Sequence, residues 1–279
     1  MTEINPIYLQ NQAINFAGSA KSVESTDNPH NLVNVKTAKE VGEIAKKAIG
    51  TMPHRIATAG YSAPPEGYEE STKQFLKALD SELGTRSTAF VTSPTADKGS
   101  IDAITSEVSG MNDKKLFYVT AQDYVGYINP KNFPSTIDSV AYSKIPKYVL
   151  PDAAEYSKAT AEASNVFVAT GGRNATVSDF VNAINKGNKA IILDNPAINS
   201  PAWGEAKNRV ENASEYLVSQ LDAFNVGKEL PYPEVGEFTA DYLAKNADKL
   251  NSLVKVVTIE GDDNKSVLKA AKKAAEFIK

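Results

Sequence analysis

The chain contains no cysteine, and histidine occurs only twice, at His30 and His54. Without cysteine there can be no disulfide and no thiolate metal site, and the composition says nothing about a redox compartment. With so little histidine, only a metal site dominated by carboxylates could form. We therefore expect no metal ion and no resident cofactor.

Long apolar runs are also absent. No stretch of the sequence approaches the roughly 20 apolar residues that a membrane span requires. Near the start, Glu3 stands where a secretory signal would carry Lys or Arg, and no continuous apolar segment follows it. We expect a cytoplasmic protein with no membrane partner.

Strong charge of one sign is missing as well. The 30 basic and 34 acidic residues give a net charge of −4 and are spread along the chain, without the basic block of a nucleic-acid surface. The lysine-rich segment 265–279 has Val267, Ala271 and Ile278 at helical spacing, which is typical of an amphipathic helix with a solvated face. We expect no nucleic-acid partner.

What the sequence does contain is an alternation of short apolar runs and amphipathic segments. The runs predict buried strands, and the segments between them predict helices, as expected for parallel strands covered on both faces. The fold class predicted is α/β, with a Rossmann-like, mainly parallel sheet and helices on both faces. The strands are expected at 56–60, 88–92, 116–119, 147–150, 165–169 and 190–193, and the helices at 37–49, 66–83, 100–108, 152–163 and 176–185.

Three parts are expected along the chain. Residues 1–35, rich in Asn and Ser, predict an irregular N-terminal arm, and residues 36–200 form the Rossmann-like core. Residues 201–279 predict a mostly helical C-terminal extension with one strand at 253–259 and a terminal helix. Within the core, residues 123–139 contain two prolines and are expected to form a long connection.

Ligands of open parallel sheets lie beyond the carboxyl ends of the strands, so the loops that follow the strands are the places to search. In the first such loop, Gly60 permits a tight turn, Ser62 offers a hydroxyl, and Tyr61 or Tyr68 could stack on a base. The alternative is a proline-rich turn with surface tyrosines. Both interpretations stay open for this loop.

The second loop carries Ser93, Lys98, Gly99 and Ser100, with a helix expected to begin at its end. The first amides of a helix have no internal partner, so hydroxyls, a lysine and these amides together could bind an anion. The alternative is that Asp97 or Ser100 only caps the helix. Asp102, one turn further on, is either a site carboxylate or a helix-surface acid.

The third loop is the most informative. Gly171 and Gly172 follow a buried strand and permit close approach of a ligand to the backbone, and Arg173, Asn174 and Thr176 lead into a helix. The helix start supplies free amides and the positive end of its dipole, which favour a phosphate. We expect these five residues to bind the ligand.

Residues 165–193, with Gly171-Gly172, Ala175-Thr176 and Asp179, resemble the Gly-Gly-x-Gly-Thr-x-x-Glu motif of the LOG-like superfamily. This superfamily includes cytokinin-activating phosphoribohydrolases, the DNA-processing protein DprA and SLOG nucleotide-sensing domains. The second loop, through Lys98 and Gly99, resembles the family more loosely. The resemblance implies a nucleotide ligand and a homodimer, and it places Asp179 where the hydrolases have a glutamate that acts on the N-glycosidic bond.

The sequence also departs from this pattern. Thr170 replaces a proline, Ala175 replaces a glycine, and Glu155-Tyr156 stand where the hydrolases have an Arg-Lys pair. The aspartate at 179 is one methylene shorter than a glutamate, and such a displacement can cost on the order of 100-fold in rate. These departures favour binding over hydrolysis.

Three functional hypotheses follow. The first is a SLOG-type module that binds a nucleotide or nucleotide-derived ligand through the Gly171-Gly172 loop, with Arg173 as an ionic clamp. The second is an N-glycosidic hydrolase of nucleoside 5′-monophosphates or related nucleotides, in which Asp179 is catalytic. The third is an interaction scaffold that makes its contacts through residues 201–279. A nucleoside deoxyribosyltransferase-like fold is disfavoured, because the glycine pair has no place in its pattern.

Overall fold

The computed structural model describes residues 30–95, 97–128, 135–198, 200–261 and 263–279. Eight strands form one sheet in the order β1-β5-β4-β3-β2-β6-β7-β10, and every neighbouring pair is parallel. The predicted α/β class with a mainly parallel sheet is confirmed. The strands are β1 (Leu32–Asn34), β2 (His54–Ala59), β3 (Thr88–Thr92), β4 (Leu116–Ala121), β5 (Lys147–Leu150), β6 (Val166–Ala169), β7 (Lys189–Asp194) and β10 (Val254–Thr258).

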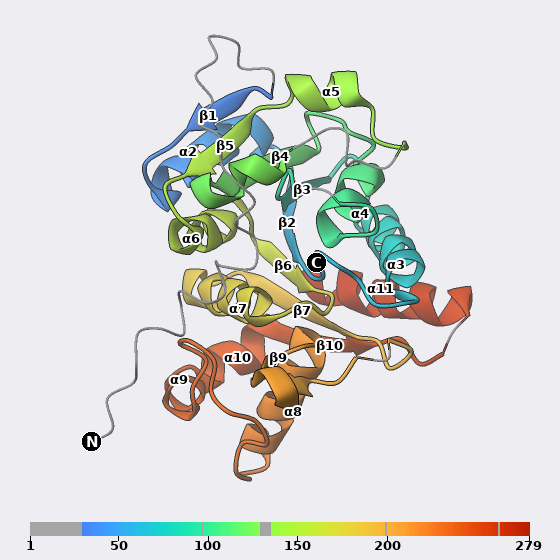
Figure 1. Cartoon of the computed structure of the whole chain (residues 1–279). Helices are drawn as coiled ribbons and strands as arrows, with labels where there is room; N and C mark the ends of the chain where they lie inside the picture. Colours follow the sequence, from blue (N-terminus) through green and yellow to red (C-terminus); the bar gives the residue numbers. More distant parts are fainter. Residues whose placement is uncertain (1–29, 96, 129–134, 199, 262) are drawn as a thin grey trace.

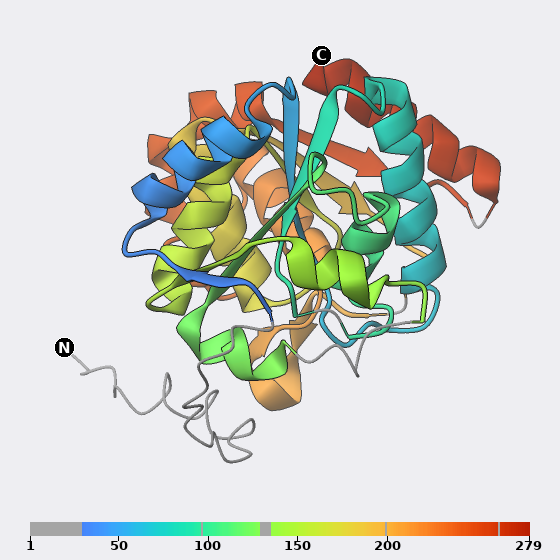
Figure 2. The same ribbon diagram turned by 90° about the horizontal axis from the view of Figure 1, so that it is seen from above.

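Helices cover both faces of the sheet (Figures 1 and 2). One face carries α2 (Ala38–Ile49), α6 (Ala153–Ala163), α7 (Asn174–Lys186) and α8 (Ala213–Asn225), and the other carries α3 (Tyr68–Leu83), α4 (Ile101–Val108) and α11 (Asn264–Ile278). Shorter elements are η2 (Gln122–Tyr127), α5 (Ser139–Lys144), η4 (Glu205–Lys207), α9 (Ala240–Lys245), α10 (Ala247–Leu253) and a hairpin of β8 (Trp203–Gly204) and β9 (Arg209–Val210). None of the helices in these described ranges is long and apolar enough to span a membrane.

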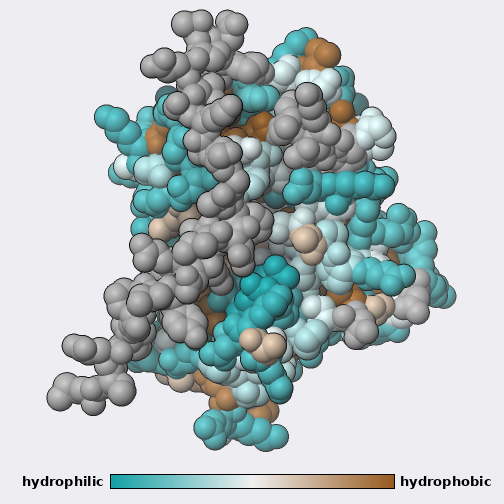
Figure 3. All heavy atoms as spheres, in the orientation of Figure 1, coloured by the Kyte–Doolittle hydropathy of each residue, from teal (hydrophilic) through white to brown (hydrophobic). Residues whose placement is uncertain are grey.

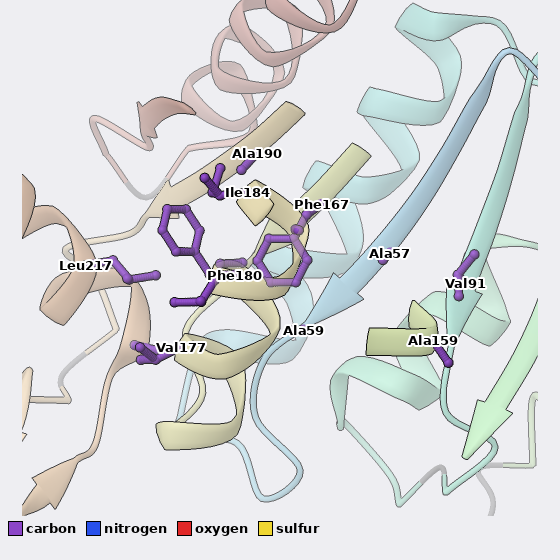
Figure 4. Close-up of a cluster of buried hydrophobic side chains, with 14 of the residues drawn as sticks. Ala57, Ala59, Val91, Ala159, Phe167, Val177, Phe180, Ile184, Ala190 and Leu217 are labelled. Atoms are coloured by element: carbon purple, nitrogen blue, oxygen red, sulfur yellow. The ribbon is translucent and has the colours of Figure 1, made fainter. Parts of the chain in front are cut away.

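The central strands are buried on both faces. All residues of β3 and β4 are inaccessible to solvent, which explains why their sequences show continuous apolar runs and not an alternation. On one face, Phe180 of α7 packs against Phe167 of β6 with ring centroids 6.4 Å apart, beside Ile184 and Leu217 (Figure 4). Burying a phenylalanine of this size contributes about 2–3 kcal/mol. This packing holds α7 at a fixed position behind the end of β6.

Most of the longer helices begin at a side-chain cap. Thr37, Ser100, Asp152, Asn212 and Asp263 each accept a hydrogen bond from a first-turn amide of the helix that follows. Helix α7 differs, because its N-cap residue is Arg173, whose side chain makes no capping hydrogen bond. Its first amides are therefore left for another acceptor.

The ends of the chain join the sheet more closely than the sequence indicates. Of the expected arm, residues 1–29 lie outside the described residues, while Leu32–Asn34 forms β1 at the edge of the sheet beside β5. At the other end, β10 pairs with β7 along its whole length. Helix α11 lies along α3 in both views (Figures 1 and 2). The C-terminal segment thus completes the central sheet and one of its helical layers.

Two local expectations differ from the structure. The long connection at 123–139 contains η2 and the first residue of α5, and its residues 129–134 lie outside the described part. The apolar spacing of Val210, Leu217 and Leu221 predicts one helix, but Val210 lies in β9. Helix α8 begins only at Ala213, because the Asn212 side chain accepts from the Glu215 amide and caps it.

Candidate functional site

The chain changes direction within the sheet between β2 and β6. From β2 it proceeds outward through β3 and β4 to β5, and it then returns to add β6 on the opposite side of β2. The loop after β2 leads to α3 on one face of the sheet, and the loop after β6 leads to α7 on the other. This is a topological switch point, where loops diverge and open α/β sheets bind their ligands. Both the Gly60 and the Gly171-Gly172 loops lie there.

The glycines at this point let the two loops pack on each other. Gly171 and Gly172 have φ angles of +105° and +88°, which side chains rarely adopt. A Cβ atom on Gly171 would lie 2.3 Å from the Tyr61 ring, and one on Gly172 would lie 2.7 Å from the Gly60 carbonyl oxygen. Gly60 is constrained in the same way, since its Cβ would lie 2.2 Å from the Tyr68 hydroxyl. The glycine pair is thus required by contacts within the protein.

Tyr61 fills the space over Gly171. Its side chain packs edge-on to Tyr68, with ring centroids 5.0 Å apart, and its carbonyl oxygen accepts from the Ile101 amide at the start of α4. The residue is only 5% exposed, and its hydroxyl has no hydrogen-bond partner among the described residues. The Gly172 amide and Ser200 lie near enough to favour the ionised phenol, although neither forms a full hydrogen bond with the hydroxyl. Burial is the larger effect and raises the pKa of Tyr61.

The amides of the third loop are only partly available. The Gly171 amide donates to Ser214 Oγ at 2.7 Å, and the Gly172 carbonyl oxygen accepts from the Ala213 amide at the start of α8. The amides of Asn174 and Ala175, in the uncapped first turn of α7, have no internal acceptor among the described residues. An anion at this loop would bond to the first turn of α7, because Ser214 occupies the Gly171 amide.

Two carboxylates lie in the helices that follow the second and third loops. Asp102 of α4 accepts from Thr92 Oγ1 at 2.7 Å and from the Ser93 amide at 3.0 Å, so the end of β3 holds it in place. Asp179 of α7 accepts from Ser157 Oγ of α6 at 2.6 Å. Both side chains are partly exposed, although protein surrounds them closely enough that desolvation dominates their ionisation.

Desolvation raises the pKa of Asp102 to about 6 and that of Asp179 to about 7, and the Asp102 charge raises the pKa of Asp179 further. Burial, together with the charges of both carboxylates, raises the pKa of Tyr156 well above the usual value. Perturbed acids that gather at the open end of a sheet indicate a functional site. Each of the two carboxyl groups can therefore gain or lose a proton near neutral pH.

Polar and aromatic side chains surround Asp179. Ser157 Oγ, which donates to Asp179, accepts from Asn182 Nδ2 at 2.9 Å, so α6 and α7 hold the carboxylate through a chain of hydrogen bonds. Tyr156 packs edge-on against Tyr124 of η2 with ring centroids 6.0 Å apart. This aromatic pair lies close to the carboxylates, since the Asp179 charge raises the pKa of both tyrosines.

The other residues expected to bind a ligand have varied roles. Ser100 accepts from the Ala103 amide and so caps α4, which is the alternative role that the sequence allows for it. Ser93 Oγ bonds to Thr95 Oγ1 at 2.8 Å. Ser62 and Lys98 are exposed. Gly99 has a φ of +76°, and its Cβ position is 2.9 Å from Glu69 Oε2.

The remaining third-loop residues are engaged within the protein. Asn174 Oδ1 accepts from the Val210 amide at 3.0 Å. Thr176 is buried with its Oγ1 against Gly172. Arg173 pairs through Nε with Glu211 at 3.0 Å, and this ion pair holds its guanidinium group in place.

Sequence reasoning named Tyr68 only as a residue that could stack on a base, and it did not find Ser157, Ser214 or Glu211. The Tyr68 hydroxyl bonds to Thr170 Oγ1 at 2.7 Å across 102 positions of sequence. Ser157 and Ser214 lie in ordinary amphipathic helices and carry no distinguishing local pattern. Nothing in the sequence near any of these residues indicates its distant partner.

Two hollows of the described surface are separate from these loops. Two hollows of about 570 and 240 Å³ lie away from the switch point, the first around Leu230 and Tyr232 and the second around Lys73 and Met111. The described residues contain no group of three or more histidine or acidic side chains that could hold a metal ion. The face seen in Figure 3 is mainly hydrophilic, with scattered apolar residues. The chemically distinctive groups are those at the switch point.

Comparison of the sequence with protein-family models gives no match, and no curated protein is significantly similar to it.

Proposed function

We propose that this protein binds a nucleotide or nucleotide-derived ligand at the switch point between β2 and β6. The observation that carries the proposal is the coincidence of three features there: the diverging loops, the uncapped start of α7, and the paired carboxylates Asp102 and Asp179. The ligand phosphate lies at the first turn of α7. The sugar lies toward the carboxylates, which can accept hydrogen bonds from its hydroxyls.

The first turn of α7 is suited to an anion for two reasons. The Asn174 and Ala175 amides have no internal acceptor among the described residues, and the helix dipole places partial positive charge at this end. The buried Tyr61 hydroxyl adds a donor that also lacks an acceptor in the described part of the chain. A phosphate oxygen would supply the missing acceptor, and leaving such a buried donor unpaired costs about 1–3 kcal/mol.

The resemblance of residues 165–193 to the LOG-like motif supports the same proposal, since nucleotides are the ligands of that superfamily. Tyr156 stands where the resembled hydrolases have a lysine, and it lies beside Asp179 and against Tyr124. An aromatic pair at that place favours contact with a ring or a sugar over charge stabilisation.

The substitution Ala175→Asp tests this proposal. Ala175 is exposed in the first turn of α7, so an aspartate there interacts favourably with the helix dipole and stabilises the unliganded protein by about 0.5 kcal/mol. The same charge repels a bound phosphate. We expect AMP to raise the melting temperature of the wild-type protein, and Ala175→Asp to weaken its affinity by about tenfold or more.

The matched control is Ala175→Asn, which is similar in size and carries no charge. It should bind AMP within about threefold of the wild type, because the backbone amides are kept. If AMP and the other nucleoside monophosphates all leave the melting temperature of the wild type unchanged, the binding proposal is refuted. Equal affinity of Ala175→Asp and Ala175→Asn would place the phosphate elsewhere.

A second function is favoured by the ionisation of the carboxylate pair. We propose, as the alternative, hydrolysis of the N-glycosidic bond, in which water adds to the anomeric carbon and the base leaves with a proton. Ionised Asp179 stabilises the positive charge that develops on the ribose. Asp102 accepts the proton of the attacking water and releases it to solvent, and the departing base takes its proton from solvent. With pKa values of about 7 and 6, both groups can be ionised at mildly alkaline pH.

The alternative predicts a rate that rises with pH until Asp179 is fully ionised, above about pH 7. Asp179→Asn keeps the oxygen that accepts from Ser157 and removes the charge, so it should lower the release of free base from AMP by about 100-fold or more. The assay is chromatography of adenine after incubation with AMP, and Asp222→Asn, at an exposed position of α8, is the control. Undiminished release by Asp179→Asn would exclude this mechanism.

A further inference from the structure

Three basic side chains converge on one carboxylate beside the start of α7. Glu211 accepts from Arg173 Nε at 3.0 Å through one oxygen and from Arg209 Nε at 2.8 Å through the other, and Lys207 Nζ lies 3.9 Å from it. We call Arg173, Lys207, Arg209 and Glu211 the Glu211 cluster. Its three cations and one anion leave two positive charges in excess. Hydrogen bonding to Arg209 and the three cations together lower the pKa of Glu211, against the opposing effect of burial.

The geometry of the two arginines leaves their binding groups open. Each is bonded to Glu211 through its Nε atom, and the terminal amino groups make no other hydrogen bond within the described residues. A guanidinium presents those two groups side by side, in the spacing that matches two phosphate oxygens. Glu211 thus acts as a positioning residue, which holds two guanidinium groups close together against their mutual repulsion.

The fold fixes the Glu211 cluster against the third loop. The β8–β9 hairpin brings Arg209 opposite Gly204, and the Cβ position of Gly204 lies only 2.7 Å from Glu211 Cγ. The neighbouring Val210 amide donates to Asn174 Oδ1 in the first turn of α7. The hairpin, and with it Arg209, is therefore attached directly to the helix start.

The Tyr61 hydroxyl provides a separate observation at the same place. The Tyr61 hydroxyl is buried and has no hydrogen-bond partner within the described ranges, and the two charged groups that influence it are Arg173 and Glu211. A buried donor close to Arg173, whose terminal amino groups are open, fits an acceptor of negative charge. Arg173 is 46% exposed and Arg209 24%, so an anion can reach both from solvent.

We propose that the Glu211 cluster is a second anion subsite, so that the ligand carries a diphosphate and is a nucleoside diphosphate or a dinucleotide. One phosphate lies at the first turn of α7, as in the proposed function on which this inference rests. The other is bound by the terminal amino groups of Arg173 and Arg209, with Lys207 at the rim. A nucleoside monophosphate fills only the first subsite.

The test compares two pairs of probes by isothermal titration calorimetry at matched ionic strength: AMP with ADP, and inorganic phosphate with inorganic pyrophosphate. The second pair removes any dependence on the base. We expect the wild-type protein to bind each diphosphate about tenfold or more tightly than the corresponding monophosphate, because charge-assisted hydrogen bonds to two guanidinium groups are gained.

The diagnostic variant is Arg209→Gln, which removes the charge and the paired amino groups at a partly exposed position. It should lower the affinity for ADP and pyrophosphate by about tenfold and change that for AMP and phosphate by less than about twofold. Arg209→Lys keeps the charge and loses the paired geometry, so it should fall between Arg209→Gln and the wild type. Lys228→Gln, at an exposed lysine outside the cluster, is the control for loss of charge.

Glu211→Gln separates positioning from simple attraction. If Glu211 orients the arginines, this variant weakens ADP binding although it removes a negative charge. Tighter ADP binding would show that only net charge matters, and it would overturn the positioning role. Equal affinity for mono- and diphosphates, unchanged by Arg209→Gln, refutes the second subsite and leaves the proposed function intact. Binding of pyrophosphate through Arg209, with no binding of either nucleotide, supports the subsite and refutes the proposed function. Failure of all four probes refutes both.

Discussion

At the scale of single residues, the switch point shows how one feature of sequence can serve two purposes. A glycine pair between a strand and a helix predicts close approach of a ligand, but here the positive φ angles and the contacts with Tyr61 and Gly60 already require glycine. The ligand-binding capacity of the loop then resides in what the internal contacts leave free. These groups are the first amides of α7 and the Tyr61 hydroxyl.

The requirement for glycine at 171 gives a direct prediction. Gly171→Ala places a methyl group within 2.3 Å of the Tyr61 ring at a strained φ, so the loop and the ring must both move. We expect a loss of about 3 kcal/mol or more in the free energy of unfolding, measured by denaturant titration. Gly187→Ala is the matched control, since Gly187 has a φ of +86° and no atom near its Cβ position.

Gly187→Ala should cost only the backbone strain, about 1 kcal/mol. The difference between the two variants measures the packing of Tyr61 on the glycine loop. If both variants lose the same free energy, the contact with Tyr61 contributes nothing to stability, and the ring is free to leave the loop.

At the scale of elements, α11 illustrates how a lysine-rich segment becomes part of the core. Its lysines face solvent, while Val267, Ala270, Ala271, Ala274 and Ala275 are buried against the sheet and α3. Small side chains at these positions permit close helix packing. The amphipathic spacing in the sequence predicts the helix, and the tertiary structure supplies the surface that it covers.

Two substitutions on α11 test this packing. Ala274→Asp places a carboxylate at a position that is 0% exposed and should cost more than about 3 kcal/mol in the free energy of unfolding. Lys272→Asp changes the charge of an exposed position on the same helix and should stay within about 0.5 kcal/mol of the wild type. Thermal unfolding followed by circular dichroism compares them. Equal stability of the two variants would mean that α11 does not pack as described.

At the scale of the whole molecule, the buried titratable groups make opposing contributions to stability. The pKa values of Asp102 and Asp179 are raised, so the folded protein binds more protons than the unfolded chain between about pH 4 and pH 7, and stability falls as pH rises through this window. Lys147 of β5 is fully buried and bonded to the Tyr142 carbonyl oxygen, and desolvation lowers its pKa to about 7. The folded protein therefore binds fewer protons than the unfolded chain between about pH 7 and pH 10, and stability rises there.

We predict that the free energy of unfolding of the unliganded protein passes through a local minimum near pH 7. The Asp102→Asn, Asp179→Asn double variant should remove most of the decline on the acidic side, which is about 1–3 kcal/mol between about pH 5 and pH 7. Lys147→Met should remove the rise on the alkaline side. Denaturant titrations across this pH range provide the measurement, and a wild-type profile with a maximum near pH 7 would contradict the prediction.

The elements of this protein were largely determined by its sequence alone. Strand and helix periods are local properties, and the apolar runs at 88–92, 116–119 and 147–150 lie within the strands β3, β4 and β5. The parallel α/β class follows from their alternation with helices. Short elements such as β1 and the β8–β9 hairpin give no such signal, because two or three residues do not establish a period.

The candidate site was decided by the tertiary structure. Asp179 and the third-loop glycines could be selected from sequence, since their pattern lies within one strand-loop-helix unit. The Tyr61 ring on Gly171, the Ser157 hydroxyl on Asp179 and the Arg173 guanidinium on Glu211 could not, because each contact joins segments that only the folded sheet brings together. Burial then sets the chemistry: desolvation shifts the carboxylate pKa values, and a residue's burial depends on all the elements packed around it.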